Sequence, residues 1–594
     1  MAIYHAPVRD MRFVYHELLE SAALHGLPGY EDATPDVVDA VLEQAGKLCE
    51  NVLLPINRSG DEEGCRLEDG VVKTPAGFKE AYRTFAEGGW TAIVGDPTYG
   101  GQGLPHTVNI LVQEMICSTN LSFGIYPGLS YGAYHAIHAH GSEALKQTYL
   151  PKLVDGTWSG TMCLTEPQCG TDLGMVRTRA VPQDDGTYKI TGTKIFISAG
   201  DHDLTENIIH LVLARTPDAP AGIKGISLFL VPKMRVNGTN NVTGANGVSC
   251  GALEHKMGIK ASSTCVINFE ESTGFLIGEL NKGMRAMFTM MNAARLQVGM
   301  QGLGLAEAAY QNATAYARER IQGRSLNGSK HTDKPADPII VHPDVRRMLL
   351  TMRAYTEGGR ALAGWIAIHL DVIEKHPDPE KRREAEDLVA LLTPIAKAFF
   401  TDTGFEMTNL GLQVFGGHGY IREHGIEQYV RDARITQLYE GTNGVQALDL
   451  VGRKLPAHMG RYLRRFFHPV SEFIEAHDGD SAMQEFVVPL AKAFGRLQRA
   501  TGWIAQQGLR DPEEAGAAAT DYLRLFGFVA LAYVWARTAE IALEQRDGDN
   551  TGFYDAKLRT ARFFMQKLLP QTSGLFAAIM AGACPVMEFD AAAF

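Results

Sequence analysis

One acidic residue in the second half of the chain has the surroundings expected of a catalytic base. Glu440 is followed by Gly441, Thr442, Asn443 and Gly444, and the residues on both sides of this group have helical character. Because glycine and asparagine tolerate the backbone angles at a helix end, we predict that a helix stops at Glu440 and a turn begins. A carboxylate on such a turn can reach into a cleft and take a proton. By itself, the pattern is more often that of a solvated loop residue.

Three other segments could contact a ligand. MCLTEPQCGTDLG, residues 162–174, has glycines and threonines that could wrap a phosphate or an aromatic ring system, although a glycine-rich strand connection explains it as well. KIFISAG, residues 194–200, has the pattern of a strand. GLQVFGGHGYIREHG, residues 411–425, has paired glycines that allow close backbone approach. It lacks the lysine and the strand context of an ATP-binding P-loop, and His418 is more typical of a loop residue than of an acid or base.

Composition excludes several classes of partner. The 594 residues carry a net charge of −12, which argues against nucleic acid and anionic membranes. The eight cysteines are scattered without a CxxC pair or histidines at ligand spacing, so we expect reduced thiols and no metal site.

The ends and the hydropathy of the chain predict a cytoplasmic protein. The first residues contain charge and proline where a signal peptide needs an apolar core. The longest apolar run, Leu525 to Ala536, is shorter than the roughly 20 residues of a transmembrane helix, so none is expected.

Hydrophobic periodicity divides the chain into helical and strand-rich parts. Helical spacing over 12–30, 36–52, 76–88 and 106–156 gives way to alternating or β-branched runs over 159–280. Helical spacing then returns over 284–322, 342–375, 380–412 and 425–438 and again after 456. We therefore predict a mainly α protein with a central small antiparallel β domain. The expected divisions are an N-terminal extension 1–35, a helical domain 36–158, a β domain 159–281, a helical bundle 282–455 and an additional helical domain 456–594.

Five motifs, in order along the chain, resemble the acyl-CoA dehydrogenase family: CLTEPQCGTD at 163–172, KIFIS at 194–198, LIGELNKGMRAMF at 276–288, QVFGGHGY at 413–420 and YEGT at 439–442. The resemblance covers about 75–455. The opening segment and the helical tail are similar to the large bacterial branch of about 600 residues, which includes long- and medium-chain dehydrogenases and 3-methylmercaptopropionyl-CoA dehydrogenases.

The resemblance implies a chemistry in which each residue has a family counterpart. The family forms a trans-2-enoyl-CoA from an acyl-CoA: a carboxylate takes the α proton and a hydride leaves the β carbon for N5 of FAD. Glu440 matches this base. Some relatives take the base from the helix after the β domain, but the matching position here is Ala294, and no carboxylate lies between Glu279 and Glu307.

The resemblance also implies binding residues. For FAD these are Leu164, Thr165, Gly170, Thr171, Phe196, Ile197, Ser198, Arg320, Gln322, His342 and Thr442, with Gln413, Gly416 and Gly417 contacting the cofactor of a neighbouring subunit. For the acyl-CoA substrate they are Thr171, Asn292, Arg295 and Gly441.

The resemblance further implies electron transfer to electron-transferring flavoprotein, and the additional helical domain favours a homodimer. Three alternatives stay open at this point. These are 3-methylmercaptopropionyl-CoA as the specific substrate, an acyl-CoA oxidase that passes electrons to oxygen, and a non-catalytic acyl-CoA-binding flavoprotein.

Overall fold

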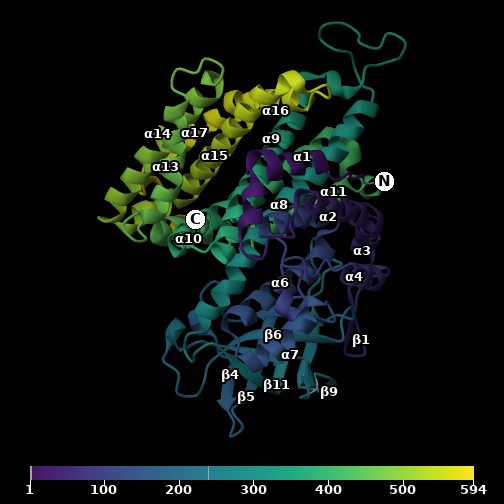
Figure 1. Ribbon diagram of the computed structural model, residues 1–594, viewed down its shortest axis with the longest axis vertical. Coiled ribbons are helices and arrows are strands. Elements are labelled where there is room, and N and C mark those ends of the chain that lie inside the picture. Colours follow the sequence, from purple (N-terminus) through teal and green to yellow (C-terminus); the bar gives the residue numbers. More distant parts are fainter. Residues whose placement is uncertain (1–2, 239) are drawn as a thin grey trace. The chain divides into compact units, whose positions relative to one another are not determined.

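The computed structural model describes residues 3–238 and 240–594 (Figure 1). The chain divides into two compact units. The first contains residues 1–46, 105–118 and 298–594, and the second contains residues 47–104 and 119–297. Each unit therefore collects segments that are distant in the sequence.

Helices and a sheet make up the second unit. Its helices are α3 (Asn57–Glu63), α4 (Phe78–Glu87), α6 (Leu121–His140) and α7 (Glu143–Val154), and a short hairpin joins β1 (Arg66–Glu68) to β2 (Val71–Lys73). The start of α6 is fixed by Asn120, whose side chain accepts a hydrogen bond from the backbone N–H of Phe123 at 3.0 Å. Ser142 caps α7 in the same way.

The main sheet has seven strands in the order β3, β6, β7, β11, β5, β4, with β10 also paired to β11. Their bounds are β3 Trp158–Cys163, β4 Arg179–Pro182, β5 Tyr188–Ser198, β6 Asn207–Ala214, β7 Ser227–Pro232, β10 Val248–Leu253 and β11 Thr264–Ile277. A separate hairpin joins β8 (Met234–Val236) to β9 (Val242–Ala245). Strands β3 and β6 are parallel and the other pairs are antiparallel.

The central strands are buried on both faces. Every residue of β6 and β7 is buried. Leu211 of β6 belongs to an apolar cluster with Ile137 of α6 and Leu150 of α7, whereas its neighbour Val212 belongs to a second cluster with Phe269 of β11. Because successive strand residues face opposite sides, these two clusters cover the two faces of the sheet. The long apolar runs seen in the sequence follow from this double burial.

Helices make up the first unit. They are α1 (Val8–Arg12), α2 (Pro35–Leu48), α5 (His106–Thr119), α8 (Gly283–Glu319), α9 (Pro343–Lys375), α10 (Pro379–Phe415), α11 (Ile426–Arg434), α12 (Asn443–Asp449), α13 (Arg461–Ala476), α14 (Gln484–Gly508), α15 (Pro512–Gln545), α16 (Phe553–Phe563), α17 (Thr572–Met580) and α18 (Cys584–Met587). The division between the units falls within α8, after Gln297, and between the last two residues of α5.

Helix α15 is the centre of the C-terminal helices, where it packs against α14, α16 and α17 (Figure 1). It also packs on α9 and α10. Gly527 of α15 permits the contact with α10, because a Cβ there would lie 2.3 Å from the Phe399 ring. The apolar run 525–536 is thus a core segment.

Two segments, Pro379–Tyr420 and Pro512–Gly548, are long and apolar enough to cross a membrane by length and composition. However, 78% and 83% of their most apolar windows are buried inside the protein. Burial of this extent is typical of core helices.

Most sequence-predicted elements agree with the structure, but α3 was not predicted, and three further differences follow. The expected helix 12–30 is replaced by α1, a π-helix at Phe13–Leu18 and a 3-10 helix at Ser21–Gly26. Glu20 interrupts the helical path because its φ is +47°. The β1–β2 hairpin was not predicted. The sheet is mixed rather than purely antiparallel, because residues 164–206 carry the chain back so that β6 pairs in parallel with β3.

Candidate functional site

The turn that carries Glu440 has the predicted local structure. A 3-10 helix, Ile435–Gln437, ends just before it, and α12 begins just after it at Asn443. Glu440 has φ +56° and Gly441 has φ +81°, so two successive residues are left-handed. This conformation is unusual for glutamate, and such strain is found preferentially at functional sites. The predicted turn at Glu440 is confirmed, and the helical segment before it ends three residues earlier, at Gln437.

Side chains next to the turn limit its movement. The hydroxyl of Tyr439 donates to Oε1 of Gln301 on α8. Burial raises the pKa of Tyr439, so the phenol remains a neutral donor. Thr442 caps α12, because its Oγ1 accepts the N–H of Val445 at 3.3 Å. The Nε2 of Gln446 donates to the carbonyl oxygen of Glu440 at 3.1 Å.

Helix α10 supplies a second set of contacts to this turn. The Nζ of Lys397 donates to the carbonyl oxygen of Gly441 at 2.9 Å and to Oδ1 of Asn443 at 2.8 Å. Asp402, one turn further along α10, accepts hydrogen bonds from Asn443 and Gln437, both at 2.7 Å. Sequence reasoning did not single out Lys397. Its sequence signal is that it is the one charged residue in the apolar run LLTPIAKAFF. The structure buries it fully, and a fully buried lysine needs partners.

In the second unit, the 162–174 segment and strand β5 lie side by side. The N–H of Ile195 donates to the carbonyl oxygen of Thr165 at 2.9 Å. The Nζ of Lys194 donates to the carbonyl oxygen of Leu164 at 2.9 Å and to the carboxylate of Glu166 at 2.8 Å. Two candidate cofactor-binding segments, 162–174 and 194–200, are therefore joined by a backbone hydrogen bond and by a buried ion pair.

Phe196 gives this region a surface suited to a flat ring. Its side chain is 59% exposed and its φ is +58°, whereas the next residue, Ile197, is buried. Ser198 is half-buried, and Gly170 and Thr171 are exposed. An exposed aromatic ring on β5, in a region that also carries Ser198 and the exposed Gly170 and Thr171, suits an isoalloxazine, which needs a flat apolar contact and hydrogen bonds at its edge. The residues present fit FAD.

The remaining candidate cofactor residues form a group in the first unit. The imidazole of His342 lies 2.8 Å from the carbonyl oxygen of Gln322, and the carbonyl oxygen of Arg320 accepts the N–H of Ile339 at 2.8 Å. The side chain of Tyr316 stacks on Phe415 with ring centroids 4.1 Å apart. Residues 316–322 and the glycine turn after α10 are therefore neighbours.

The glycine turn itself is open to solvent. Gln413, Gly416 and Gly417 are exposed. A Cβ added at either glycine would meet nothing within 4 Å. Gly416 has φ +59°, so glycine is favoured there by the backbone rather than by crowding. This arrangement leaves room for the predicted contact with a cofactor.

The two candidate CoA residues lie on consecutive turns of α8. Asn292 is exposed and Arg295 is buried, with Nη1 of the arginine 3.5 Å from Oδ1 of the asparagine. The guanidinium also lies 5.9 Å from the centre of the Phe288 ring. The candidate residues therefore fall into four groups. One is the turn Glu440, Gly441 and Thr442, and the second is 164–171 with 196–198. The third is Arg320, Gln322 and His342 near 413–417, and the fourth is Asn292 with Arg295.

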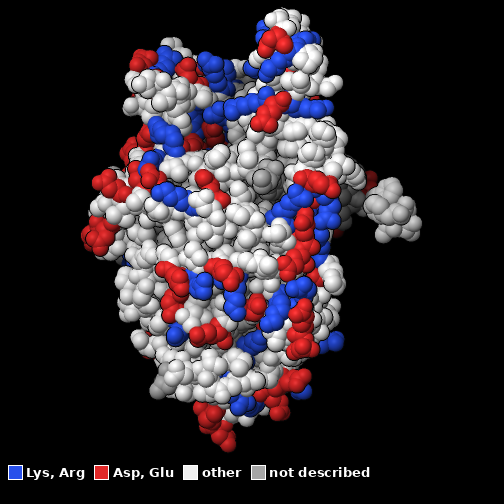
Figure 2. Space-filling view, turned by 90° about the vertical axis from the view of Figure 1, so that its right-hand side faces the viewer, with Lys and Arg blue, Asp and Glu red and all other residues white. Residues whose placement is uncertain are grey.

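Two further features concern the surface charge and the absence of a metal site among the described residues. On the face drawn in Figure 2, lysine and arginine side chains are interspersed with aspartate and glutamate. Among the residues that the structure describes, no group of three or more His, Cys, Asp or Glu side chains is placed to hold a metal ion.

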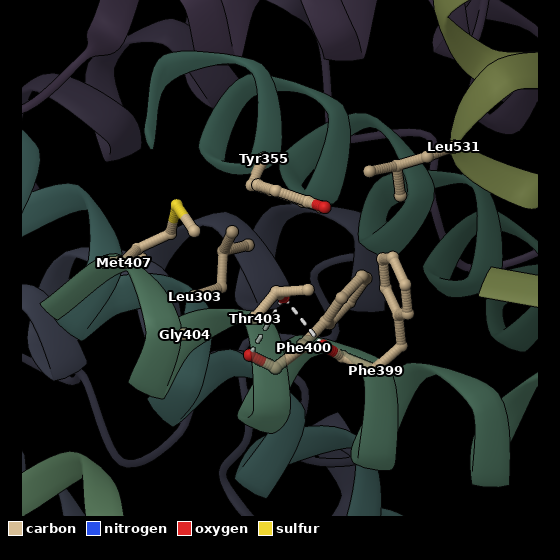
Figure 3. A pocket seen from close by; sticks show the side chains of 9 residues that line it. Leu303, Tyr355, Phe399, Phe400, Thr403, Gly404, Met407 and Leu531 are labelled. Carbon is tan, nitrogen blue, oxygen red and sulfur yellow. Dashed lines mark hydrogen bonds between the residues drawn. The ribbon is translucent and has the colours of Figure 1, made fainter. Parts of the chain in front are cut away.

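A small cavity within the first unit lies among the core side chains of α8, α9, α10 and α15 (Figure 3). It has room for about one water molecule. Tyr355, Phe399 and Leu531 point toward it, and the hydroxyl of Thr403 donates a hydrogen bond to the carbonyl oxygen of Phe399 (Figure 3). This cavity is a packing gap rather than a substrate pocket.

Helices, a β sheet and further helices follow one another along the chain, and a carboxylate lies on a left-handed turn in the last helical part, as the resemblance to the acyl-CoA dehydrogenase family implies. Four family models match in sequence: the acyl-CoA dehydrogenase N-terminal domain at 37–157, the middle domain at 161–272, the C-terminal domain at 281–455, and the acetyl-CoA dehydrogenase C-terminal-like domain at 466–590.

Similarity over the full length agrees with these matches. The chain is 45% identical to 3-methylmercaptopropionyl-CoA dehydrogenase of Ruegeria pomeroyi over 96% of this chain and 97% of that protein. It is 33% identical to the broad-specificity linear acyl-CoA dehydrogenase FadE5 of Mycobacterium tuberculosis over 100% of both chains. The chain belongs to the acyl-CoA dehydrogenase family, whose members are oxidoreductases acting on CH–CH bonds and using FAD.

A solved structure shows the same fold. It is an acyl-CoA dehydrogenase of Bacillus anthracis complexed with FAD, with a TM-score of 0.73 and 22% identity. The similarity covers 92% of this chain and 88% of that one. The predicted fold class, including the additional C-terminal helices, is confirmed.

Proposed function

We propose that this protein is an FAD-dependent acyl-CoA dehydrogenase in which Glu440 removes the α proton of an acyl-CoA thioester and a trans-2-enoyl-CoA is formed. The single observation that supports Glu440 most is its left-handed conformation on a turn held from α8, α10 and α12. A carboxylate carried by a strained turn that several neighbours hold is the expected form of a preorganised base.

Removal of an α proton needs assistance, because a carbon acid beside a thioester is weak. Donors aimed at the thioester oxygen lower the barrier by stabilising the enolate that develops. The backbone N–H of Glu440 is proposed as one such donor. The half-buried carboxylate keeps the base partly shielded from water, which favours proton abstraction over solvation.

The cofactor contacts are proposed for the residues grouped above. Leu164, Thr165, Phe196, Ile197 and Ser198 would hold the ring system. Arg320, Gln322 and His342 would hold the phosphates and the adenosine, and Gln413, Gly416 and Gly417 would reach the cofactor of a second subunit. When bound, FAD supplies the acceptor for the two electrons that leave the substrate.

Substrate contacts are proposed for a smaller set. Arg295 would place a positive charge near the nucleotide end of CoA. Asn292 lies one turn before it on the same helix. Thr171 and Gly441 would line the thioester end, and Thr442 would contact the flavin as well as cap α12.

The 45% identity over nearly the full length favours 3-methylmercaptopropionyl-CoA as the substrate over straight-chain acyl-CoAs. A panel from propionyl-CoA to palmitoyl-CoA, with 3-methylmercaptopropionyl-CoA included, tests this choice by kcat/KM. A higher value for butyryl-CoA or palmitoyl-CoA would contradict it.

Electron transfer and assembly complete the proposal. Electrons would pass to electron-transferring flavoprotein from a homodimer in the cytoplasm. Fast transfer to that flavoprotein with slow reoxidation in air distinguishes this dehydrogenase from an oxidase, and sedimentation of the holoenzyme gives the oligomeric state.

The base assignment is tested by Glu440→Gln, which keeps the shape of the side chain and removes its basicity. The variant should retain FAD and remain yellow when acyl-CoA is added without oxygen, whereas the unaltered protein bleaches. Turnover within about tenfold of the unaltered protein would refute Glu440 as the base.

A further inference from the structure

Lys397 is the buried cation that lies next to the proposed catalytic turn. Its side chain is completely buried, in a stretch of α10 where Ile395, Ala398 and Phe399 are buried as well. A buried ammonium is costly unless hydrogen-bond acceptors replace its lost water. Two of its acceptors belong to the turn: the carbonyl oxygen of Gly441 at 2.9 Å and Oδ1 of Asn443 at 2.8 Å.

Asn443, which accepts a hydrogen bond from Lys397, also binds two other residues of α10. Its Nδ2 donates to Oδ1 of Asp402 at 2.7 Å and to Oγ1 of Thr401 at 3.0 Å. The amide oxygen therefore faces a cation while the amide nitrogen faces a carboxylate, which fixes the orientation of the side chain. Since Gln437 also donates to Asp402 at 2.7 Å, α10 holds the chain on both sides of Glu440.

The backbone between these anchors is the strained part. Glu440 and Gly441 are both left-handed, a conformation that costs glutamate on the order of 1 kcal/mol or more and persists only when neighbours impose it. The Gly441 carbonyl is the backbone group that Lys397 binds directly. The ammonium of Lys397 therefore fixes the peptide unit between Gly441 and Thr442, one residue after the unit that joins Glu440 to Gly441.

We infer that Lys397 is a positioning residue for Glu440, acting through Gly441 and Asn443 and not through contact with the substrate. This inference rests on the proposed function of Glu440. The ammonium of Lys397 would hold the turn so that the carboxylate of Glu440 approaches the α carbon of the substrate in one orientation. A displacement of about 1 Å at such a group lowers turnover on the order of 100-fold.

The test compares two buried lysines of the same unit. Lys397→Met removes the charge and the donors while nearly keeping the volume, and Lys397→Arg keeps both the charge and the donors. Lys557→Met is the matched control, because Lys557 is also buried but pairs with Asp10 and Glu357. The holoenzymes are compared for FAD content, thermal unfolding, kcat and KM.

A second readout isolates proton removal. Acetyl-CoA has no β carbon, so its deuterium uptake in D₂O, followed by mass spectrometry, reports α-proton removal alone. Lys397→Met should lower kcat and deuterium uptake by about the same factor, roughly 10- to 100-fold, with KM changed less than threefold. Lys397→Arg should recover part of both, and Lys557→Met should lower the unfolding temperature with kcat within threefold.

The outcomes separate this inference from the proposed function. If Glu440→Gln is inactive while Lys397→Met keeps kcat and deuterium uptake within threefold, Lys397 has no positioning role. If Glu440→Gln retains turnover, the base assignment itself fails. If Lys397→Met does not fold, the same measurements are made on Asn443→Ala, which removes the link to Asp402. If neither variant folds, the role of Lys397 is structural and the inference is overturned.

Discussion

The Nζ atom of Lys194 lies 2.8 Å from the Oε1 atom of Glu166, and both side chains are buried. The pair joins β5 to the 162–174 segment, which together carry most of the proposed flavin contacts. Glu166 also accepts the N–H and the hydroxyl of Thr178 at 3.0 and 2.6 Å. A single carboxylate therefore sets the course of the segment that follows β3.

Lys194→Met should destabilise the protein by about 3–5 kcal/mol, because it leaves a buried carboxylate without its cation. Urea unfolding of the holoenzyme measures the loss, and FAD retention should fall with it. The free energy of unfolding lost by the double variant Lys194→Met, Glu166→Gln should be smaller than the sum of the losses in the two single variants. Additive losses would show that the two side chains do not stabilise each other.

The same pair predicts a dependence of stability on acid. Burial alone would raise the pKa of Glu166, but the charge of Lys194 and the hydrogen bonds from Lys194, Thr178 and Arg177 lower it to about 2. A lowered carboxyl pKa stabilises the folded state above the unfolded value of 4.5, and this contribution is lost as the pH falls toward 2. The free energy of unfolding should therefore decrease from about pH 5 to pH 3, and less steeply in Glu166→Gln.

Glu114 predicts the opposite slope at higher pH. It lies in a buried cluster where Arg360 contacts Asp10, Glu114 and Glu307. Burial raises the pKa of Glu114 to about 7 despite the Arg360 charge. A raised carboxyl pKa stabilises the folded state below 4.5 and this contribution is lost as the pH rises through 7.

Chemical unfolding between about pH 5 and pH 8 measures this second slope. Stability should fall as the pH rises, and Glu114→Gln should flatten the change because it cannot titrate. An unchanged slope in the variant would assign the pH dependence to another group.

Gly441→Ala tests the backbone of the proposed catalytic turn. An added Cβ at Gly441 would lie 2.6 Å from Nε2 of Gln446, and the φ of +81° disfavours alanine. We expect a loss of about 1–2 kcal/mol in stability and of about tenfold or more in kcat. Gly444→Ala is the matched control, since a Cβ there meets only Oγ1 of Thr442 at 4.0 Å. Equal kcat values in the two variants would contradict the importance of the left-handed turn.

Much of the architecture follows from local patterns. The 3.6-residue spacing of apolar side chains predicts the long helices that became α8, α9 and α10, and alternation predicts the β segment. The helix end before Glu440 was predictable because Gly441 and Asn443 accept turn conformations. The break at Glu20 was not, because a left-handed glutamate has no sequence signal of its own.

Motifs and hydrophobic spacing were enough to predict the family, the mainly helical fold with a central sheet, and Glu440 as the candidate base. The contacts that hold the turn of Glu440 became visible only in the folded chain. Lys397 and Gly441 are 44 positions apart, and no local pattern pairs an ammonium with a distant carbonyl. That pairing exists because packing of the helices removes the lysine from water, and its ammonium then needs acceptors such as the Gly441 carbonyl.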